Sequence, residues 1–306
     1  MIIINLKGGL GNQLFQYATG RALSLRQADK NKKNSAKNDT SNKQILKLDI
    51  TGYSENNGID TMRHYALSPF NIKVEIASTD EIKKLKYPFG IISKGWRFFK
   101  TKVLKKYNIS FNSGIFNSTK PLYLDGFFQT EKYFIDKENE IRNDLTLKDP
   151  LSQRAVEILT KINSCSNSIS LHVRRGDYVS DKNTNLHHGT CDSSYYAKAV
   201  EYMNAKIGND MHIFVFSDGI EWAKENIKFP YVTSYVSPIK STPRDEVEEL
   251  VLMSKCRHNI IANSSFSWWG AWLNQNRDKI VIAPKRWVLR GVNNYRDIIP
   301  QTWHKI

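Results

Sequence analysis

The second half of the chain alternates short apolar runs with longer segments of helical periodicity. Short apolar runs bounded by turn residues are typical of strands buried on both faces. The expected strands are 168–173, 212–218, 231–236, 259–263 and 279–284, and the expected helices are 194–206, 219–227, 244–256 and 265–275. This alternation predicts a parallel, doubly wound α/β sheet.

The first half begins in the same way, with an expected strand at 2–6, a turn at 7–12, a helix at 13–27 and a further strand at 45–50. Residues 29–43 are almost entirely polar, and we expect a mobile surface insertion there. A proline, a helix and a Ser/Asn-rich stretch mark a domain boundary within 145–168. We place it so that 1–160 and 161–306 form two Rossmann-like domains facing across a cleft.

Composition fits a soluble globular protein, since 40% of the 306 residues are hydrophobic and 25% are charged. No apolar run reaches membrane-span length, and the N-terminus resembles a strand more than a signal peptide. Cys165, Cys191 and Cys256 are few and widely spaced, which favours reduced thiols and a cytoplasmic location. Cys165 and Cys256 are expected to be packing residues of the interior, and the role of Cys191 stays open.

The net charge of +15 indicates anionic partners. Segment 83–106 contains nine basic residues, no acidic residue and interleaved apolar side chains. This pattern is typical of a basic amphipathic segment on an anionic membrane surface, here the inner membrane. A solvated helix with its aromatic side chains in the core explains the pattern equally well.

Polar residues follow three expected strands in the second half. Arg174 and Arg175 come after the first, Ser217 and Asp218 after the second, and 263–267 (NSSFS) after the third. Each feature alone is ordinary: a surface ion pair, a turn, a helix cap. Ligands of open parallel sheets bind beyond the carboxyl ends of the strands, however, and arginine and helix starts bind phosphate. Together, the polar residues after the three strands predict a site for a nucleotide diphosphate.

Several nucleotide-binding patterns are absent from the sequence. The turn KGGLGN fails the dinucleotide pattern because its third glycine position is Leu14, and no P-loop motif occurs. No Asp-x-Asp occurs either. We therefore expect a protein without metal or other cofactor, which neutralises a departing diphosphate with arginine, hydroxyl groups and backbone dipoles.

Four motifs give the chain a specific resemblance. GGLGNQLFQYA (8–18), HVRRGDY (172–178), FSDGIEW (216–222) and ANSSFSWWGAWL (262–273) resemble the bacterial α-1,2-fucosyltransferases of glycosyltransferase family 11, and HHGTCDSSYY (187–196) is similar to a stretch in some members. The resemblance implies a GT-B fold, GDP-L-fucose as donor, inversion and no metal. It also implies transfer to the 2-hydroxyl of a terminal β-galactoside, including lactose-type acceptors, in surface glycan (O-antigen or lipopolysaccharide) synthesis.

The resemblance also implies roles for single residues. Domain 161–306 would bind GDP-fucose and domain 1–160 would lie on the acceptor side. Arg174 would bind the β-phosphate, and His172 and Asp218 would read guanine and ribose. The loop around the diphosphate would contain Ser265, Phe266, Ser267 and Trp268, although Trp268 and Trp269 could equally be core residues. The fucose and acceptor side would contain Asn12, Gln13, Asp125 and Gln129.

The catalytic base stays open at this point. Asp177 could take the acceptor proton or orient an arginine, and His188 could act as base or contact the acceptor. A loose transition state would need little help from a base. Two alternatives also stay open: a transferase of the same fold with another GDP-sugar, and a basic nucleic-acid-binding protein whose affinity would fall steeply with salt.

Overall fold

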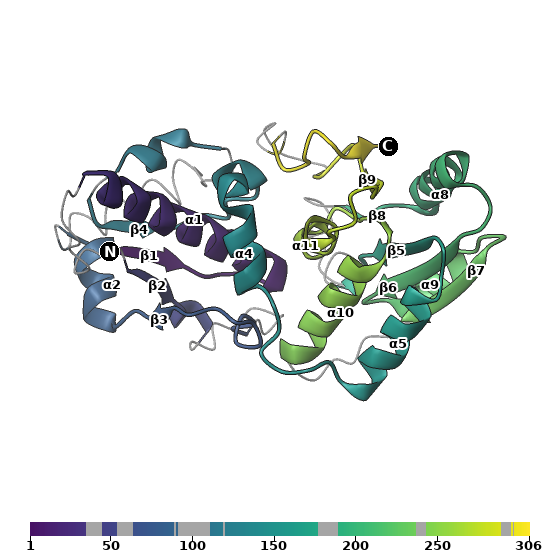
Figure 1. Ribbon diagram of the computed structural model, residues 1–306, viewed down its shortest axis with the longest axis horizontal. Helices are drawn as coiled ribbons and strands as arrows, with labels where there is room; N and C mark the ends of the chain where they lie inside the picture. Colours follow the sequence, from purple (N-terminus) through teal and green to yellow (C-terminus); the bar gives the residue numbers. More distant parts are fainter. Residues whose placement is uncertain are drawn as a thin grey trace. The chain divides into compact units, whose positions relative to one another are not determined.

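The computed structural model describes residues 1–34, 45–53, 64–88, 90, 111–118, 120–176, 189–236, 243–288, 295 and 297–306. The chain divides into two compact units, Met1–Leu147 and Lys148–Ile306 (Figure 1). The division falls inside the expected stretch but earlier than residue 160, which lies within helix α5 (Gln153–Asn163). Helix α5 belongs to the second unit because Ser152, its N-cap residue, hydrogen-bonds to both carboxylate oxygens of Glu248. The expected cleft between the two domains stays a prediction.

The first unit is built on a four-stranded parallel sheet of order β3-β2-β1-β4. Its strands are β1 (Ile2–Asn5), β2 (Leu46–Asp49), β3 (Glu75–Ile76) and β4 (Leu122–Leu124). Its helices are α1 (Leu10–Asn34), α2 (Thr79–Lys86) and α4 (Glu138–Asp144), with 3₁₀ turns η2 (Thr51–Tyr53), η4 (Ser113–Asn117), η5 (Glu131–Tyr133) and η6 (Ile135–Lys137). Gly20 lets α1 lie close to the sheet, because a Cβ there would be 2.9 Å from Leu46 Cδ1.

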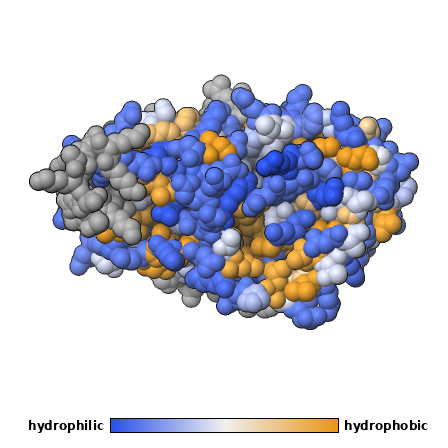
Figure 2. Space-filling view, in the orientation of Figure 1, coloured by the Kyte–Doolittle hydropathy of each residue, from blue (hydrophilic) through white to orange (hydrophobic). Residues whose placement is uncertain are grey.

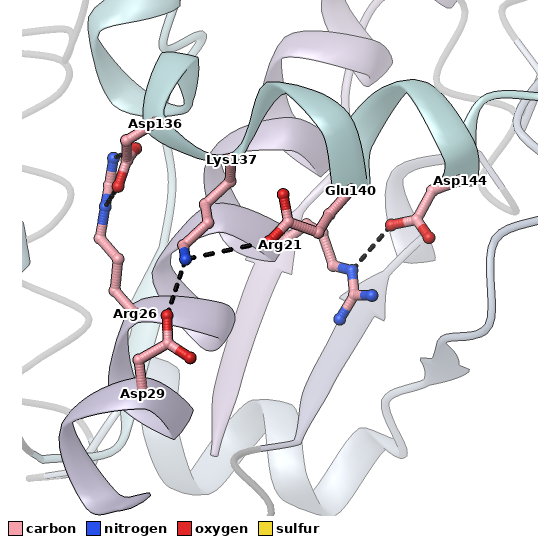
Figure 3. A network of polar contacts seen from close by, with 7 residues as sticks. All are labelled: Arg21, Arg26, Asp29, Asp136, Lys137, Glu140 and Asp144. Atoms are coloured by element: carbon pink, nitrogen blue, oxygen red, sulfur yellow. Dashed lines mark hydrogen bonds and ion pairs between the residues drawn. The ribbon is translucent and has the colours of Figure 1, made fainter. Parts of the chain in front are cut away.

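Helix α1 is longer than the sequence predicts. Residues 29–34, expected in a mobile insertion, form its last turns, so that expectation is wrong for them; residues 35–43 lie outside the described part of the chain. Ion pairs join α1 to η6 and α4, and one of them lies in the added turns at Asp29 (Figure 3). Arg21 pairs with Asp144 at 2.7 Å, and Asp29 pairs with Lys137 at 2.7 Å. Arg26 pairs with Asp136, and in Figure 3 the Lys137–Asp29 contact lies between this pair and Arg21–Asp144.

The second unit contains a six-stranded sheet of order β10-β9-β8-β5-β6-β7, parallel throughout. Its strands are β5 (Ser168–Val173), β6 (His212–Ser217), β7 (Val232–Val236), β8 (His258–Ile260), β9 (Val281–Ala283) and β10 (His304–Lys305). Its helices are α5, α8 (Ser193–Ile207), α9 (Ile220–Asn226), α10 (Pro243–Lys255) and α11 (Ser265–Leu273). The expected parallel sheet is confirmed, with β10 as a strand that the sequence did not predict.

Strand β5 is buried along its whole length, and its two faces differ. Ile169, Leu171 and Val173 lie in the hydrophobic core with the apolar side chains of α8. The alternate face is polar: the Ser170 hydroxyl accepts a hydrogen bond from Asn259 at 2.7 Å, and the His172 ring lies 5.7 Å from the ring of Phe266 in α11. Because side chains alternate along a strand, His172 shares the face of β5 turned toward α11.

Most of the basic segment expected on a membrane lies outside the described residues, which include only 83–88 and 90 of it. Residues 83–86 belong to α2, which begins with a capping box between Ser78 and Glu81. The face shown in Figure 2 is largely hydrophilic. Among the helices that the structure describes, none is both long and apolar enough to cross a membrane.

Candidate functional site

The carboxyl ends of the adjacent strands β5 and β6 bring Arg174 and Asp218 together, as the sequence predicts for parallel neighbours. Arg174 Nη1 lies 2.8 Å from Asp218 Oδ2, and the two side chains are 20% and 17% exposed. The pair is therefore largely shielded from water and still reachable by a ligand.

Asp218 also holds the backbone turn that follows β5. Its Oδ1 accepts the Arg175 N–H at 2.7 Å, and a Cβ on Gly176 would lie 2.4 Å from Oδ2. Burial alone would raise the pKa of Asp218. Arg174 and the backbone N–H groups of Arg175 and Gly176 outweigh burial and hold the pKa below its usual value. Asp218 is accordingly an ionised anchor for residues 174–176.

Arg175 has a different environment from Arg174. Its guanidinium lies 3.9 Å from the ring centroid of Trp222 in α9, a cation–π contact. Gly219 permits this close approach, because a Cβ there would be 3.0 Å from Arg175 Cβ. Arg175 thus braces β5 against α9, and Arg174 is the arginine left for a ligand-binding role.

His172 supplies a buried nitrogen at the end of β5. The residue is 4% exposed, and among the described residues Nδ1 has no hydrogen-bond partner. Burial lowers the pKa of His172 to about 4, with a further decrease from Arg174 and a partial offset from Asp218. The ring is therefore neutral at pH 7. A buried unpaired nitrogen is rare in folded proteins, and a ligand that binds here would satisfy it.

The start of α11 divides the expected diphosphate loop into two kinds of residue. Ser265 and Phe266 are half-buried, and the N-cap residue Ser264 makes no side-chain capping bond. Ser267 is buried and donates to the Ser264 carbonyl at 3.3 Å. The backbone N–H groups of this first turn and Ser265 thus remain suited to an anion.

Trp268 corrects the expectation that it lines the diphosphate. It is fully buried, and its indole N–H donates to the Ile298 carbonyl at 2.6 Å. Its ring packs against Trp269, Trp272 and Trp303. Trp268 and Trp269 are both core residues, which is the alternative the sequence left open.

Gln13 corrects a second expectation, because its side chain is completely buried. Its amide nitrogen donates to the carbonyls of Gly8 at 3.1 Å and His64 at 2.8 Å, and its amide oxygen accepts the Ala66 N–H at 2.9 Å. These bonds leave no polar group of Gln13 turned toward a sugar. Gln13 instead joins the start of α1 to residues 64–66.

Asn12 and Gln129 meet beyond the ends of β1 and β4, with Gln129 Nε2 donating to Asn12 Oδ1 at 2.7 Å. Gly8 has a φ of 80°, and a Cβ there would lie 2.5 Å from Asn12 Nδ2, so the turn needs glycine. Phe128, just before Gln129, has a φ of 51°, an uncommon conformation for a bulky residue. Such backbone outliers cluster at functional sites.

Asp125 lies at the same edge of the first sheet and is ion-paired. Lys7 Nζ lies 2.9 Å from its Oδ1, and Asn5 Nδ2 donates to the same oxygen at 3.2 Å. Lys7 also lies 4.8 Å from the ring centroid of Phe127. Lys7 is a residue that sequence reasoning missed, although its position directly after the first strand was a signal that could have identified it.

The two residues expected as bases, Asp177 and His188, lie outside the described residues, so their roles stay predictions. In the part of the chain that is described, no group of three or more His, Cys, Asp or Glu side chains is arranged to hold a metal ion. The expectation of a metal-free reaction likewise stays a prediction. Cys191 lies beside Asn263 with Sγ 3.7 Å from Oδ1, and burial raises the pKa of its thiol to about 11.

Two units, each built on a parallel α/β sheet within one chain, have the architecture of the GT-B fold. The fold is similar to the crystal structure of the fucosyltransferase NodZ from Bradyrhizobium, with a TM-score of 0.50, 14% identity, and coverage of 88% of this chain and 91% of that one. At this identity the likeness shows the fold alone.

The model of glycosyl transferase family 11 matches residues 1–306, and the chain belongs to this family. It is 33% identical to an alpha-1,2-colitosyltransferase of Escherichia coli over 100% of this chain and 99% of that protein. It is 30% identical to the O-antigen biosynthesis glycosyltransferase WbnK of Escherichia coli over 97% and 98%. Human galactoside alpha-(1,2)-fucosyltransferase 1 is 29% identical over 50% of this chain and 43% of that protein. Membership of glycosyltransferase family 11 is confirmed, and the α-1,2-fucosyl specificity stays a prediction.

Proposed function

We propose that this glycosyltransferase moves L-fucose from GDP-β-L-fucose to the 2-hydroxyl of a terminal β-galactoside, with inversion at the fucose carbon. The linkage is supported by two relatives whose names specify α-1,2 transfer, one from Escherichia coli and one human. The fucosyl group is supported by the human relative and by the motifs that resemble the α-1,2-fucosyltransferases.

The observation that carries the proposal is the cluster at the ends of β5 and β6. Arg174 and Asp218 form an ion pair, and both act electrostatically on His172, whose Nδ1 has no hydrogen-bond partner among the described residues. A guanine base offers two adjacent N–H donors to a carboxylate, and a diphosphate accepts two bonds from a guanidinium. GDP therefore matches the charges and hydrogen-bonding groups of this cluster.

In the reaction, an acceptor oxygen forms a bond to fucose C1 while the bond from C1 to the β-phosphate oxygen breaks. Negative charge accumulates on the departing GDP, and Arg174 with the N–H groups at the start of α11 stabilises it. No metal is needed for this step. The acceptor proton passes to a base or to solvent. Asp177 and His188 are the proposed bases, while Asp125 is a weaker candidate because Lys7 already pairs with it.

A second candidate donor differs from fucose at a single position. The relative from Escherichia coli that matches the whole chain is named a colitosyltransferase. Colitose is the 3-deoxy counterpart of L-fucose, so both sugars would present the same C1 and the same leaving diphosphate. The second candidate function is accordingly α-1,2 colitosyl transfer from the corresponding GDP-sugar.

An acceptor and donor panel tests the proposal. Purified protein is incubated with GDP-fucose, GDP-colitose, GDP-mannose or UDP-galactose, each with lactose, lacto-N-biose and Gal-β-1,3-GalNAc. The product linkage is then determined by NMR. Transfer of fucose to the galactose 2-hydroxyl is expected. Transfer from GDP-colitose at a much higher kcat/KM would favour the second candidate, and a product linked elsewhere would exclude both.

The setting we propose is surface glycan synthesis, supported by the relative named for O-antigen biosynthesis. Docking of the basic segment 83–106 on the inner membrane belongs to the same proposal. Sedimentation with vesicles containing anionic phospholipid tests it, with neutral vesicles as the control. Equal sedimentation with both kinds of vesicle would contradict it.

A further inference from the structure

The ion pair between Arg174 and Asp218 joins two groups that the proposed function assigns to opposite ends of the donor. Asp218 would contact the base, and Arg174 would contact the diphosphate. In the structure they contact each other, with Nη1 2.8 Å from Oδ2. Because Asp218 also accepts the backbone N–H groups of Arg175 and Gly176, it lacks the free acceptor sites for both donors of a base while this contact persists.

The surroundings of the Asp218 carboxylate leave little room for a shared arrangement. Oδ1 accepts the Arg175 N–H at 2.7 Å. Oδ2 bonds to Arg174 and is crowded by Gly176, where even a Cβ would approach to 2.4 Å. The N1–H and N2–H donors of guanine are parallel and need both oxygens of one carboxylate. A base that pairs with both oxygens therefore competes with the Arg174 guanidinium at Oδ2.

We propose that guanine displaces Arg174 from Asp218 and that the freed guanidinium then binds the diphosphate, so that this ion pair couples recognition of the base to binding of the phosphates. The proposal rests on the proposed function, because it assumes a GDP-sugar as donor. It adds a mechanism of donor specificity: only a base that displaces Arg174 makes this arginine available to stabilise the leaving group.

His172 supports the presence of a nucleoside at this strand end. Its Nδ1 is buried and has no hydrogen-bond partner in the described part of the chain, and the pKa of His172 responds to both Asp218 and Arg174. A nucleoside bound there would satisfy this nitrogen at the same time as it engages Asp218. The base-side groups thus lie together, and only the guanidinium has to move.

The coupling predicts a selectivity that base contacts alone would not give. Adenine and uracil do not present two adjacent N–H donors on one edge, so they cannot replace both bonds of the carboxylate. A diphosphate attached to such a base, or inorganic pyrophosphate alone, must take Arg174 away from Asp218. No base then replaces the hydrogen bond that Asp218 loses. Guanosine should therefore strengthen pyrophosphate binding, and by linkage pyrophosphate should strengthen guanosine binding by the same factor.

The first experiment uses the wild-type protein. Calorimetry measures the Kd of inorganic pyrophosphate alone, with saturating guanosine, and with adenosine at the same concentration. We expect guanosine to tighten pyrophosphate binding roughly three- to tenfold, the range that follows from a partly exposed ion pair. Adenosine should leave the Kd unchanged. Independent binding of guanosine and pyrophosphate, or competition between them, would overturn the proposal.

The second experiment uses Asp218→Asn, which keeps an acceptor for the Arg175 N–H but removes the charge that holds Arg174. Pyrophosphate should bind this variant more tightly than wild type, roughly three- to tenfold, while GDP binds more weakly. Asp278→Asn, an exposed carboxylate of the same unit, controls for the change in net charge. Adding Arg174→Gln to Asp218→Asn should abolish the gain.

If Asp218 only positions Arg174 for the phosphates, Asp218→Asn will bind pyrophosphate more weakly than wild type, and that result would refute the coupling. A gain that survives Arg174→Gln would refute it as well. Failure of wild-type protein to bind GDP would instead reject the proposed donor. GDP binding without coupling leaves the donor intact and rejects this inference alone.

Discussion

Replacing Gln13 by methionine removes three hydrogen bonds while keeping the length of the side chain. Gln13 donates to the carbonyls of Gly8 and His64 and accepts the Ala66 N–H, all without exposure to solvent. Each bond contributes about 1 kcal/mol net, and a buried donor left unpaired costs about 1–3 kcal/mol more. Gln13→Met should thus lower the free energy of unfolding of the first unit by about 4–6 kcal/mol.

Two optical probes show which of the two units loses stability. All tryptophans except Trp96 lie in the second unit, so tryptophan fluorescence reports mainly on that unit. Far-UV circular dichroism reports on both. In urea, the variant should show an early loss of ellipticity that precedes the change in fluorescence.

Gln129→Met is the matched control. Gln129 is only half-buried and donates to Asn12. The same substitution there should change stability by less than about 1 kcal/mol and should raise the KM for the acceptor. The reasoning fails if Gln13→Met stays within about 1 kcal/mol of wild type and yet abolishes transfer, because Gln13 would then contact substrate.

Three further predictions concern the second unit. Arg174→Ala should reduce kcat by at least about 100-fold with an unchanged circular dichroism spectrum, while EDTA leaves wild-type activity unaltered; an active variant would refute the role of Arg174. Trp268→Phe should lower the free energy of unfolding by about 2 kcal/mol, because the Ile298 carbonyl loses its indole donor, and a neutral effect in urea titrations would contradict this. The pKa of His172 is lowered from 6.5 in the unfolded chain to about 4, so the unfolded state binds more protons between these values. Stability should therefore fall as the pH decreases from about 6.5 to about 4, and His172→Gln should lose less over that window; equal pH profiles would contradict the assignment.

Much of the second unit could be predicted because buried parallel strands are short apolar runs. Strand β5 has the bounds that the sequence indicates. Arg174 and Asp218 could be placed together for the same reason, since the ends of neighbouring parallel strands lie at one edge of a sheet.

The end of α1 shows where such reasoning fails. Residues 29–34 are polar and resemble a loop. Contacts with residues distant in sequence support the helix there: Asp29 pairs with Lys137, and Lys30 donates to the Phe116 carbonyl. The local amino-acid composition does not indicate such partners, because they are distant in sequence. Lys7 was missed for a related reason, because its significance comes from Asp125 and Phe127 on another strand's loop.

The sequence by itself determined the fold class, the family and the residue types gathered at the strand ends, because strand periodicity and motif order are properties of the chain alone. Only the tertiary structure decided which polar side chains already have hydrogen-bond partners within the protein. Gln13 and Trp268 have all their hydrogen-bonding groups engaged in the interior, whereas one buried nitrogen of His172 has no partner among the residues that the structure describes. The physical reason is that burying a polar group is costly unless it is paired, and the pairing depends on neighbours brought close by folding.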